Sequence, residues 1–268
     1  MKGPRGVVER LGGEAHVWLL DAGRPLPPEL IAAYRGLLSV DEAERYGHLR
    51  QSRVRREFLL GRALVRTTLS RYAQVEPVEW VFRATAHGRP EISGPAGHDE
   101  LRFNLSHTRG MVACLVARGI EVGVDLEEIG RARRPLALAT ARFAPAEAAA
   151  LRSLAASDLD EHFCFLWTLK EAYLKARGVG IALGLKRFGF ALSERRDLQV
   201  DFDPGLQDRE GDWQFALFEP SGKHVLALAI RRGAGEDLRI RVREVVPLTG
   251  EVRIRELPPV AATKPPLP

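Results

Sequence analysis

Two short segments of the chain hold carboxylates and a lysine at spacings that bring their side chains together. Asp125 and Glu127 are two residues apart on an expected strand, so both carboxylates leave the same face. Glu171 and Lys175 are four residues apart on an expected helix, so they lie on one stripe. Three carboxylates and a lysine brought together are typical of a site for a hard cation and a phosphate group.

A bound cation would explain why such carboxylates stay ionised side by side. Two carboxylates about 4 Å apart repel each other by roughly 4 kcal/mol at an effective dielectric constant near 20. A divalent ion reverses this repulsion. A site with few protein ligands and open positions suits Mg²⁺, because this ion keeps waters and takes phosphate oxygens. The alternative is that Asp125 and Glu127 are solvated at a strand end, while Glu171 and Lys175 form an exposed pair worth about 0.3–0.5 kcal/mol.

A second polar segment, Arg102-Phe-Asn-Leu-Ser-His107, could contact an anion. It places Asn104, Ser106 and His107 after a short apolar run, where a turn would offer donors to a phosphate. An ordinary polar loop is the alternative interpretation. A catalytic serine is disfavoured because adjacent residues rarely point at each other.

Basic residues in the first third of the chain give two further anion-binding hypotheses. In His87-Gly-Arg-Pro90, Gly88 permits a tight turn, and His87 and Arg89 beside it could hold an anion. The alternative is a plain hairpin turn without a binding role. A run of arginines could bind phosphates or could form a solvated helix face; it consists of Arg45, Arg50, Arg53, Arg55 and Arg56.

Length and composition are those of a globular protein. The 268 residues suffice for one large domain or two lobes, and hydrophobic and charged residues make up an ordinary 45% and 28%. The net charge of +5 favours an anionic partner, which could be nucleic acid, a phosphorylated cofactor or an acidic protein. An arginine-rich composition without functional meaning is the alternative, since only six of the 40 basic residues are lysines.

Cysteine usage and hydropathy suggest a cytoplasmic protein. Cys114 and Cys164 are the only cysteines, stand in apolar surroundings and form neither a disulfide framework nor a zinc site, so we expect both to pack in the core. No apolar run approaches the length of a membrane span, and the N-terminus does not resemble a signal peptide. We therefore expect a cytoplasmic location and no membrane association.

Periodicity and turn residues predict mixed elements along the chain. Ser39-Val-Asp-Glu42 is a capping box, and Ser157 and Gly178 are expected to cap the start and the end of a long helix. Helices are predicted from residue 26, from residue 39, over 54–72 and over 158–177. Strands are predicted over 14–20, 79–83, 111–117, 122–127, 197–203, 212–220 and 224–230, with 111–117 and 122–127 paired as a hairpin.

The order of these elements predicts an α+β fold with two lobes of similar plan, since no βαβ alternation is present. The expected lobes are residues 1–128 and 129–235. Residues 236–268 form an extension, in which we expect a further hairpin and then a disordered Pro-rich end.

Taken in order, these motifs resemble those of a known family. A basic N-terminal helix, Gly-Arg-Pro, Asn-Leu-Ser-His, Gly-Val-Asp-Leu-Glu and Trp-Thr-Leu-Lys-Glu-Ala-Tyr-Leu-Lys follow one another over about residues 15–230. This series resembles the 4′-phosphopantetheinyl transferases, specifically the surfactin-type branch of two fused lobes. The resemblance implies two similar α+β lobes that form a pseudo-dimer.

The resemblance also implies roles for individual residues. Asp125, Glu127 and Glu171 would bind Mg²⁺, which grips the pyrophosphate of coenzyme A, and Lys175 would reach its phosphates. The other implied contacts to coenzyme A come from the first lobe: Arg45 at the 3′-phosphate, the turn His87, Gly88 and Arg89, and the segment with Asn104, Ser106 and His107. Arg89 matches the family's lysine by charge and not by identity. Its planar guanidinium donates in a fixed fork geometry, whereas a lysine ammonium acts as a point charge.

The implied reaction is transfer of the 4′-phosphopantetheine group of coenzyme A to a serine of an apo acyl or peptidyl carrier protein. Adenosine 3′,5′-bisphosphate is released. Glu171 is the candidate general base, and Lys175 would neutralise phosphate charge. Because carrier proteins are typically acidic, Arg131-Ala-Arg-Arg134 near Phe143 could steer them; a plain charged loop is the alternative. The family resemblance implies a monomer with no nucleic-acid partner.

Two other classes remain as alternatives. An Arg-rich nucleic-acid-binding protein is suggested only by charge, because zinc spacings and RNP-type aromatic motifs are missing from the sequence. Another Mg²⁺-dependent phosphoryl-transfer enzyme would lack both a Walker loop and the kinase motifs. The motifs leave open which carrier is served, among fatty acid, polyketide, nonribosomal peptide and lysine biosynthesis.

Overall fold

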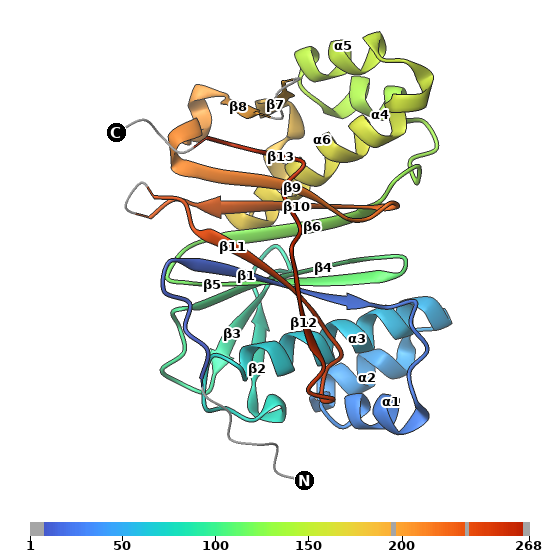
Figure 1. Ribbon diagram of the computed structural model, residues 1–268, viewed down its shortest axis with the longest axis vertical. Helices are drawn as coiled ribbons and strands as arrows, with labels where there is room; N and C mark the ends of the chain where they lie inside the picture. Colours follow the sequence, from blue (N-terminus) through green and yellow to red (C-terminus); the bar gives the residue numbers. More distant parts are fainter. Residues whose placement is uncertain (1–7, 194–196, 234–235, 265–268) are drawn as a thin grey trace. The chain divides into compact units, whose positions relative to one another are not determined.

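The computed structural model describes residues 8–193, 197–233 and 236–264 (Figure 1). The described chain divides into two compact units: unit 1 consists of residues 8–119 and 239–256, and unit 2 of residues 120–238 and 257–264. The first boundary therefore lies after residue 119, and not after residue 128 as predicted. As a result, Asp125 and Glu127 belong to the same unit as Glu171 and Lys175.

Unit 1 is built on a five-stranded sheet with the order β12-β11-β1-β5-β4. Its strands are β1 (Glu14–Asp21), β4 (Leu101–Thr108), β5 (Met111–Arg118), β11 (Arg239–Val245) and β12 (Val252–Arg255). Strand β11 runs parallel to β1, and the other neighbours are antiparallel. A separate two-stranded ribbon consists of β2 (Val81–Ala84) and β3 (Pro90–Gly94).

The helices of unit 1 are α1 (Pro28–Arg35), α2 (Val40–His48) and α3 (Ser52–Leu69). The predicted capping box is confirmed: Ser39 Oγ accepts a hydrogen bond from the Glu42 amide, and the Glu42 carboxylate accepts one from the Ser39 amide. Helix α3 buries Leu60 and Leu64 completely, one turn apart, together with Trp18 of β1. This apolar stripe holds α3 on the sheet.

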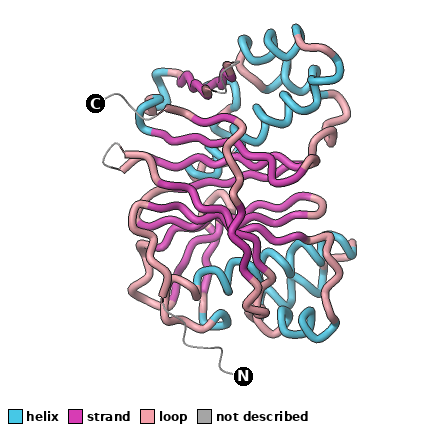
Figure 2. The backbone as a smooth tube through the Cα atoms, viewed as in Figure 1, coloured by secondary structure: helices cyan, strands magenta, loops and turns pink. Residues whose placement is uncertain are grey.

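Unit 2 is built on a four-stranded sheet with the order β13-β9-β10-β6. Its strands are β6 (Val122–Glu128), β9 (Trp213–Ser221), β10 (His224–Arg231) and β13 (Ala261–Ala262), and a second ribbon pairs β7 (Phe188–Leu192) with β8 (Leu198–Phe202). The helices are α4 (Pro135–Arg142), α5 (Pro145–Ser153) and α6 (Ala156–Arg177). Figure 2 shows helices and strands in both units, and the predicted α+β class is confirmed.

The predicted hairpin of 111–117 with 122–127 was wrong. Strand β5 pairs with β1 and β4, whereas β6 pairs with β10, so that Asp125 lies opposite Ala227. Both strands are buried on both faces over most of their length. Burial on both faces leaves no alternation in the sequence that could reveal the partner of a strand.

The long helix α6 begins two residues earlier than predicted, at Ala156. Ser157 does not cap it; its hydroxyl donates instead to Asp158 Oδ1 at 2.7 Å. The predicted stop is confirmed, because Gly178 ends the helix in the left-handed region with φ 66°. None of the helices in the described ranges has both the length and the hydropathy that crossing a membrane would require.

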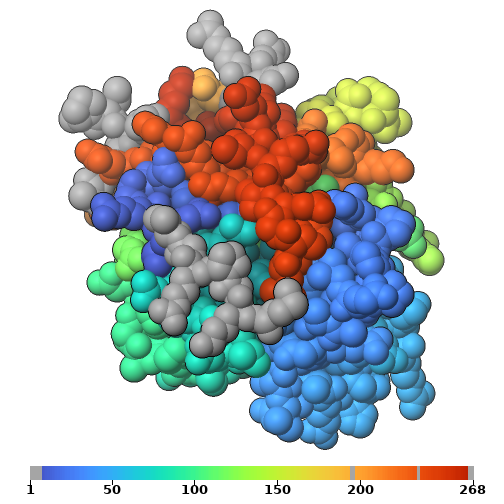
Figure 3. Space-filling view, turned by 60° about the horizontal axis from the view of Figure 1, so that its bottom comes forward, coloured from blue at the N-terminus to red at the C-terminus, as the bar shows by residue number. Residues whose placement is uncertain are grey.

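The extension after residue 235 is shared between both units and is not a separate segment. Residues 239–256 add β11 and β12 to the sheet of unit 1, so the predicted further hairpin is present as this antiparallel pair. Residues 261–262 add β13 to unit 2. In the space-filling view, the orange-red surface of residues 239–256 borders the blue surface of the N-terminal part of the same unit (Figure 3). Residues 265–268 of the predicted disordered end lie outside the described residues.

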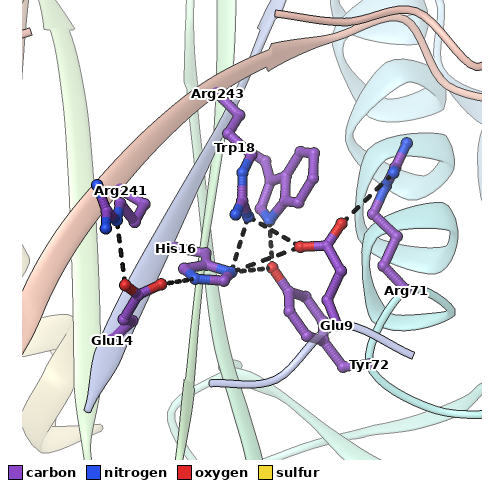
Figure 4. A network of polar contacts seen from close by, with 8 residues as sticks. All are labelled: Glu9, Glu14, His16, Trp18, Arg71, Tyr72, Arg241 and Arg243. Atoms are coloured by element: carbon purple, nitrogen blue, oxygen red, sulfur yellow. Dashed lines mark hydrogen bonds and ion pairs between the residues drawn. The ribbon is translucent and has the colours of Figure 1, made fainter. Parts of the chain in front are cut away.

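A buried polar network attaches β11 to β1 (Figure 4). Arg243 donates to His16 Nδ1 at 2.8 Å and to Glu9 Oε2 at 3.0 Å. A guanidinium can only donate, so Nδ1 carries no proton, and His16 Nε2 donates to Glu14 Oε2 at 2.9 Å. Burial lowers the pKa of His16, although the Glu14 carboxylate opposes this. The network therefore requires a neutral imidazole.

Candidate functional site

The strand and the helix that carry the predicted metal ligands meet at a glycine. A Cβ atom on Gly123 of β6 would overlap the carbonyl oxygen of Ala172 and lie 2.5 Å from the amide nitrogen of Ala176, both on α6. Only a hydrogen atom fits there, so the glycine lets the two backbones touch. The sequence reasoning treated Gly123 only as part of a motif; a glycine inside an otherwise apolar strand was the available signal.

This close approach brings Asp125 and Lys175 together. Gly123, Asp125 and Glu127 alternate along β6 and therefore face α6 on one side of the strand. Lys175 Nζ donates to Asp125 Oδ1 at 2.6 Å. The Asp125 side chain is 6% exposed and that of Lys175 is 30% exposed. Solvent therefore screens this ion pair only partly.

The other two carboxylates are shifted toward their protonated forms. Burial raises the pKa of Glu127 to about 7, with a further contribution from the charge of Asp125, against the opposing charges of Arg131 and Lys175. Burial also raises the pKa of Glu171, and the charge of Asp125 adds to the shift while Lys175 opposes it. The three carboxylates therefore influence one another across β6 and α6.

The donor chemistry of these residues fits a hard cation. Oε1 of Glu171 is buried and accepts no hydrogen bond from the described residues, so it is an acceptor available to a ligand. Carboxylate oxygens are the donors that Mg²⁺ prefers. Within residues 8–193, 197–233 and 236–264, however, no group of three His, Cys, Asp or Glu side chains is arranged to hold a metal ion. The cation seen at Asp125 is the Lys175 ammonium.

A pocket of about 240 Å³ lies beside Glu127. Arg131 is one of its lining residues, with Nη1 3.5 Å from Glu127 Oε2. The residues that line it come from β6, the loop after β6, α4 and α6; they include Glu127, Arg131, Leu138, Phe163, Cys164 and Trp167. The pocket therefore combines an apolar, aromatic wall with a charged edge next to the carboxylates.

The candidate residues of unit 1 are distributed over three elements. Arg45 is exposed on α2, with its guanidinium 5.4 Å from the ring centre of Phe58. The predicted turn at His87 and Gly88 is present between β2 and β3, and Gly88 has φ 83°. Arg89 donates from Nη2 to Glu91 Oε1 at 2.7 Å.

The segment with Asn104, Ser106 and His107 was predicted as a turn, but it lies within strand β4. Alternation along the strand sends Asn104 and Ser106 to a buried face and His107 to the other. His107 Nδ1 lies 3.7 Å from Oε2 of Glu57, which is buried on α3. Ser106 and His107 therefore do not form a nucleophile and base pair.

Both predicted core cysteines, Cys114 and Cys164, are buried, as expected.

Comparison with known proteins gives the family. A family model described as the 4′-phosphopantetheinyl transferase superfamily matches residues 121–229, which lie within unit 2. The 4′-phosphopantetheinyl transferase HetI of Nostoc sp. is 31% identical over 220 residues, which cover 82% of this chain and 89% of that protein. A phosphopantetheinyl transferase of Thraustochytrium sp. is 31% identical over 212 residues, covering 74% and 72%. The 4′-phosphopantetheinyl transferase Sfp of Bacillus subtilis is 26% identical over 181 residues, covering 66% and 77%.

The chain belongs to the 4′-phosphopantetheinyl transferase superfamily. It is thus an enzyme of the transferase class, as the motif series predicted. Neither comparison favours a nucleic-acid-binding protein or another kind of phosphoryl-transfer enzyme. The match over 121–229 includes Gly123, Asp125, Glu127, Glu171 and Lys175.

Proposed function

We propose that this protein transfers the 4′-phosphopantetheine group of coenzyme A to a serine of an apo acyl or peptidyl carrier protein and releases adenosine 3′,5′-bisphosphate. The observation that carries this proposal is the contact of β6 with α6 in a chain of this family. That contact joins Asp125 to Lys175 and couples both electrostatically to Glu171. The arrangement offers both a positive group and a base to a phosphoryl transfer.

Glu171 is the proposed general base. Its carboxylate is coupled electrostatically to Asp125 and Lys175, so it lies where a base is needed beside the transferred phosphoryl group. Its buried Oε1, which has no hydrogen-bond partner among the described residues, is the atom that would accept the proton of the carrier serine.

Lys175 is the proposed phosphate contact. Its ammonium is part-exposed and adjacent to Asp125, so it can reach an anionic group while remaining charged. Asp125 orients the ammonium through the 2.6 Å hydrogen bond. Charge neutralisation by a preorganised ammonium is stronger in a partly dry site than in water.

Asp125, Glu127 and Glu171 are the residues that would hold Mg²⁺. A bound Mg²⁺ ion would supply positive charge to the pyrophosphate oxygens of coenzyme A. Its charge would also lower the pKa of Glu127 and Glu171, which burial and Asp125 raise in the protein alone. The ion would then compete with Lys175 for Asp125.

Contacts to coenzyme A from unit 1 form a further part of the proposal. Exposed Arg45 is assigned to the 3′-phosphate, and His107, which is exposed near the end of β4, to a phosphate contact. The turn at His87, Gly88 and Arg89 is a third candidate, in which Arg89 would exchange its contact with Glu91 for one with the cofactor. Asn104 and Ser106 remain candidates, although both side chains are buried.

A carrier protein would be attracted by the exposed arginines Arg131, Arg133 and Arg134. Phe143 is itself buried, so it does not contact a partner. Because steering by exposed charges is screened by salt, kcat/KM for an acidic carrier should fall as salt rises, with kcat unchanged. A kcat/KM that is independent of salt would contradict steering.

Intact-mass measurement of an apo carrier protein, incubated with this protein, coenzyme A and Mg²⁺, tests the function. The expected result is a gain of one phosphopantetheine unit that EDTA abolishes. A gain that survives EDTA would contradict the Mg²⁺ requirement alone. The absence of both modification and coenzyme A binding would contradict the proposed reaction.

The remaining expectations concern the assembly and the environment of the enzyme. We expect a monomer that works in the cytoplasm and does not bind nucleic acid. Light scattering coupled to size-exclusion chromatography tests whether the protein is a monomer. A filter-binding titration at physiological salt tests whether it binds nucleic acid.

A further inference from the structure

Lys170 stands next to Glu171 in the motif of α6, yet it faces away from solvent. The residue is 0% exposed. Its ammonium lies 2.8 Å from Glu147 Oε2 and donates to the carbonyl oxygens of Leu185 at 2.9 Å and Phe188 at 2.5 Å. A lysine ammonium has three donors, so these three contacts use all of them. Lys170 therefore bonds only to the protein, whereas Lys175, five residues on, remains part-exposed.

Glu147 extends these contacts to two more backbone positions. Its Oε1 accepts the amide of Phe190 at 2.8 Å, and its Oε2 accepts the amide of Ala144 at 2.9 Å. The ion pair thus connects α6, the N-terminus of α5 and the segment that leads into β7. All groups lie within unit 2.

An aromatic stack connects this ion pair to the pocket beside Glu127. The Lys170 ammonium lies 5.3 Å from the ring centre of Phe143. Phe143 is stacked on Phe163 at 5.4 Å and 13°, and its centre is 6.2 Å from that of Trp167. Phe163 and Trp167 line the pocket. Rings in such contact move together when one of them is displaced.

Stability alone does not account for a charged pair at this position. Replacing a buried ion pair by apolar side chains of similar volume is often neutral or stabilising. An ion pair differs from an apolar pair in its directional contacts, and here five of them converge on two side chains. Directional contacts restrict how α6 can rotate about its own axis.

We propose that Lys170 and Glu147 are a positioning pair for the transfer reaction. They hold the Phe143–Phe163–Trp167 stack in place as the pocket wall, and they fix the rotation of α6 that directs Glu171 and Lys175 toward Asp125. This inference rests on the proposed function for its catalytic part. Its structural part, the coupling of the pair to Trp167, does not.

The double variant Lys170→Met/Glu147→Gln tests the pair without leaving a single buried charge. We expect kcat for carrier modification to fall by about tenfold or more, because small displacements of catalytic groups have effects of this size. KM for coenzyme A should change much less than kcat, since the contacts proposed for unit 1 are retained. Arg177→Gln/Asp208→Asn is the matched control, because it removes another ion pair of α6 with a buried carboxylate and does not line the pocket.

A spectroscopic measurement tests the pair independently of catalysis. Subtracting the emission of the matching Trp167→Phe protein from each background isolates the fluorescence of Trp167. We expect this emission to shift in the Lys170→Met/Glu147→Gln protein and to stay unchanged in the control. Unchanged Trp167 emission in the pair variant, or an equal loss of kcat in pair variant and control, overturns the proposal.

Phe143→Leu is a second variant that leaves the ion pair intact and interrupts its path to the pocket wall. It should reproduce both the shift in Trp167 emission and the loss of kcat, and an unaltered kcat overturns the proposal. If the unmodified protein modifies no carrier, the proposed function fails. The emission shift then still decides whether the ion pair positions Trp167.

Discussion

Each unit places a long helix on its sheet, but the two contacts differ in what comes between helix and strand. In unit 1, Gly61 of α3 faces the side chain of Leu105, whose Cδ2 lies 3.2 Å from the position of an added Cβ. In unit 2, Gly123 of β6 faces the backbone of α6 itself. Accordingly, the polar pair of unit 2, Asp125 and Lys175, is joined at 2.6 Å.

The corresponding polar contact of unit 1 is longer. Glu57 lies one turn before Gly61 on α3, and its carboxylate is 3.7 Å from His107 of β4. In unit 1 the Leu105 side chain lies between helix and strand, whereas in unit 2 the two backbones touch. The comparison indicates that reactive groups gather where two backbones touch, because short side chains from both elements then converge.

The largest expected effect is the loss of activity in Glu171→Gln. The substitution removes the proposed base and one proposed Mg²⁺ ligand without changing the size of the side chain. General-base assistance contributes roughly 10²–10⁴-fold, so transfer should nearly disappear. Carrier modification followed by mass spectrometry measures this, and circular dichroism is the control for folding. Near-normal turnover would contradict the role given to Glu171.

Lys175→Ala should have a smaller effect, with kcat reduced by about 10–100-fold and binding of coenzyme A weakened less. The ammonium neutralises charge that increases on the leaving phosphate, so its loss affects the transition state more than the bound substrate. Steady-state kinetics and calorimetric titration of coenzyme A separate these effects. The matched variant His107→Ala in unit 1 should show the opposite pattern, with a weaker binding of coenzyme A and a smaller change in kcat.

Substituting the two glycines tests the comparison directly. Gly123→Ala should lower the free energy of unfolding by about 1–3 kcal/mol or more, because the added methyl group meets backbone atoms. Gly61→Ala should change it by less than about 1 kcal/mol in either direction, since Leu105 can shift and alanine favours the helix. Chemical denaturation measures both, and equal losses would contradict the difference between the two contacts.

Two titratable groups, Glu127 and His16, should give stability opposite dependences on pH. Glu127 has a pKa of about 7 in the folded protein and an ordinary value of 4.5, so the folded state binds the proton more tightly. Its contribution to stability is therefore lost as pH rises from 4.5 toward 7. His16 has a lowered folded pKa, so its contribution is present above its ordinary value of 6.5 and is lost as pH falls below it.

Thermal unfolding from about pH 5 to pH 8 without divalent cations measures these dependences. Glu127→Gln should flatten the decrease toward neutral pH, by on the order of 1–3 kcal/mol at most. His16→Gln should flatten the decrease toward acid pH. A Glu127→Gln protein with an unchanged pH profile would contradict the burial effect on this carboxylate.

Residues that depend on local spacing were predicted well. Asp125 and Glu127 share one face of β6, and Glu171 and Lys175 share α6, because strand and helix periods depend only on near neighbours. The Ser39 capping box and the Gly178 helix stop are equally local and are both present. Asn104, Ser106 and His107 were placed in a turn, since a run of polar residues resembles a loop in the sequence, whereas in the structure Asn104 and Ser106 are buried in β4.

The sequence by itself determined the order of the reactive residues, their spacing and their assignment to a strand and a helix. Tertiary structure alone decided that β6 pairs with β10, that Gly123 touches α6 and that Lys170 turns inward while Lys175 remains part-exposed. The physical reason is the distance along the chain between the groups that interact. Periodicity is a property of a few consecutive residues, whereas strand partners, desolvation and the raised pKa of Glu127 depend on groups distant along the chain.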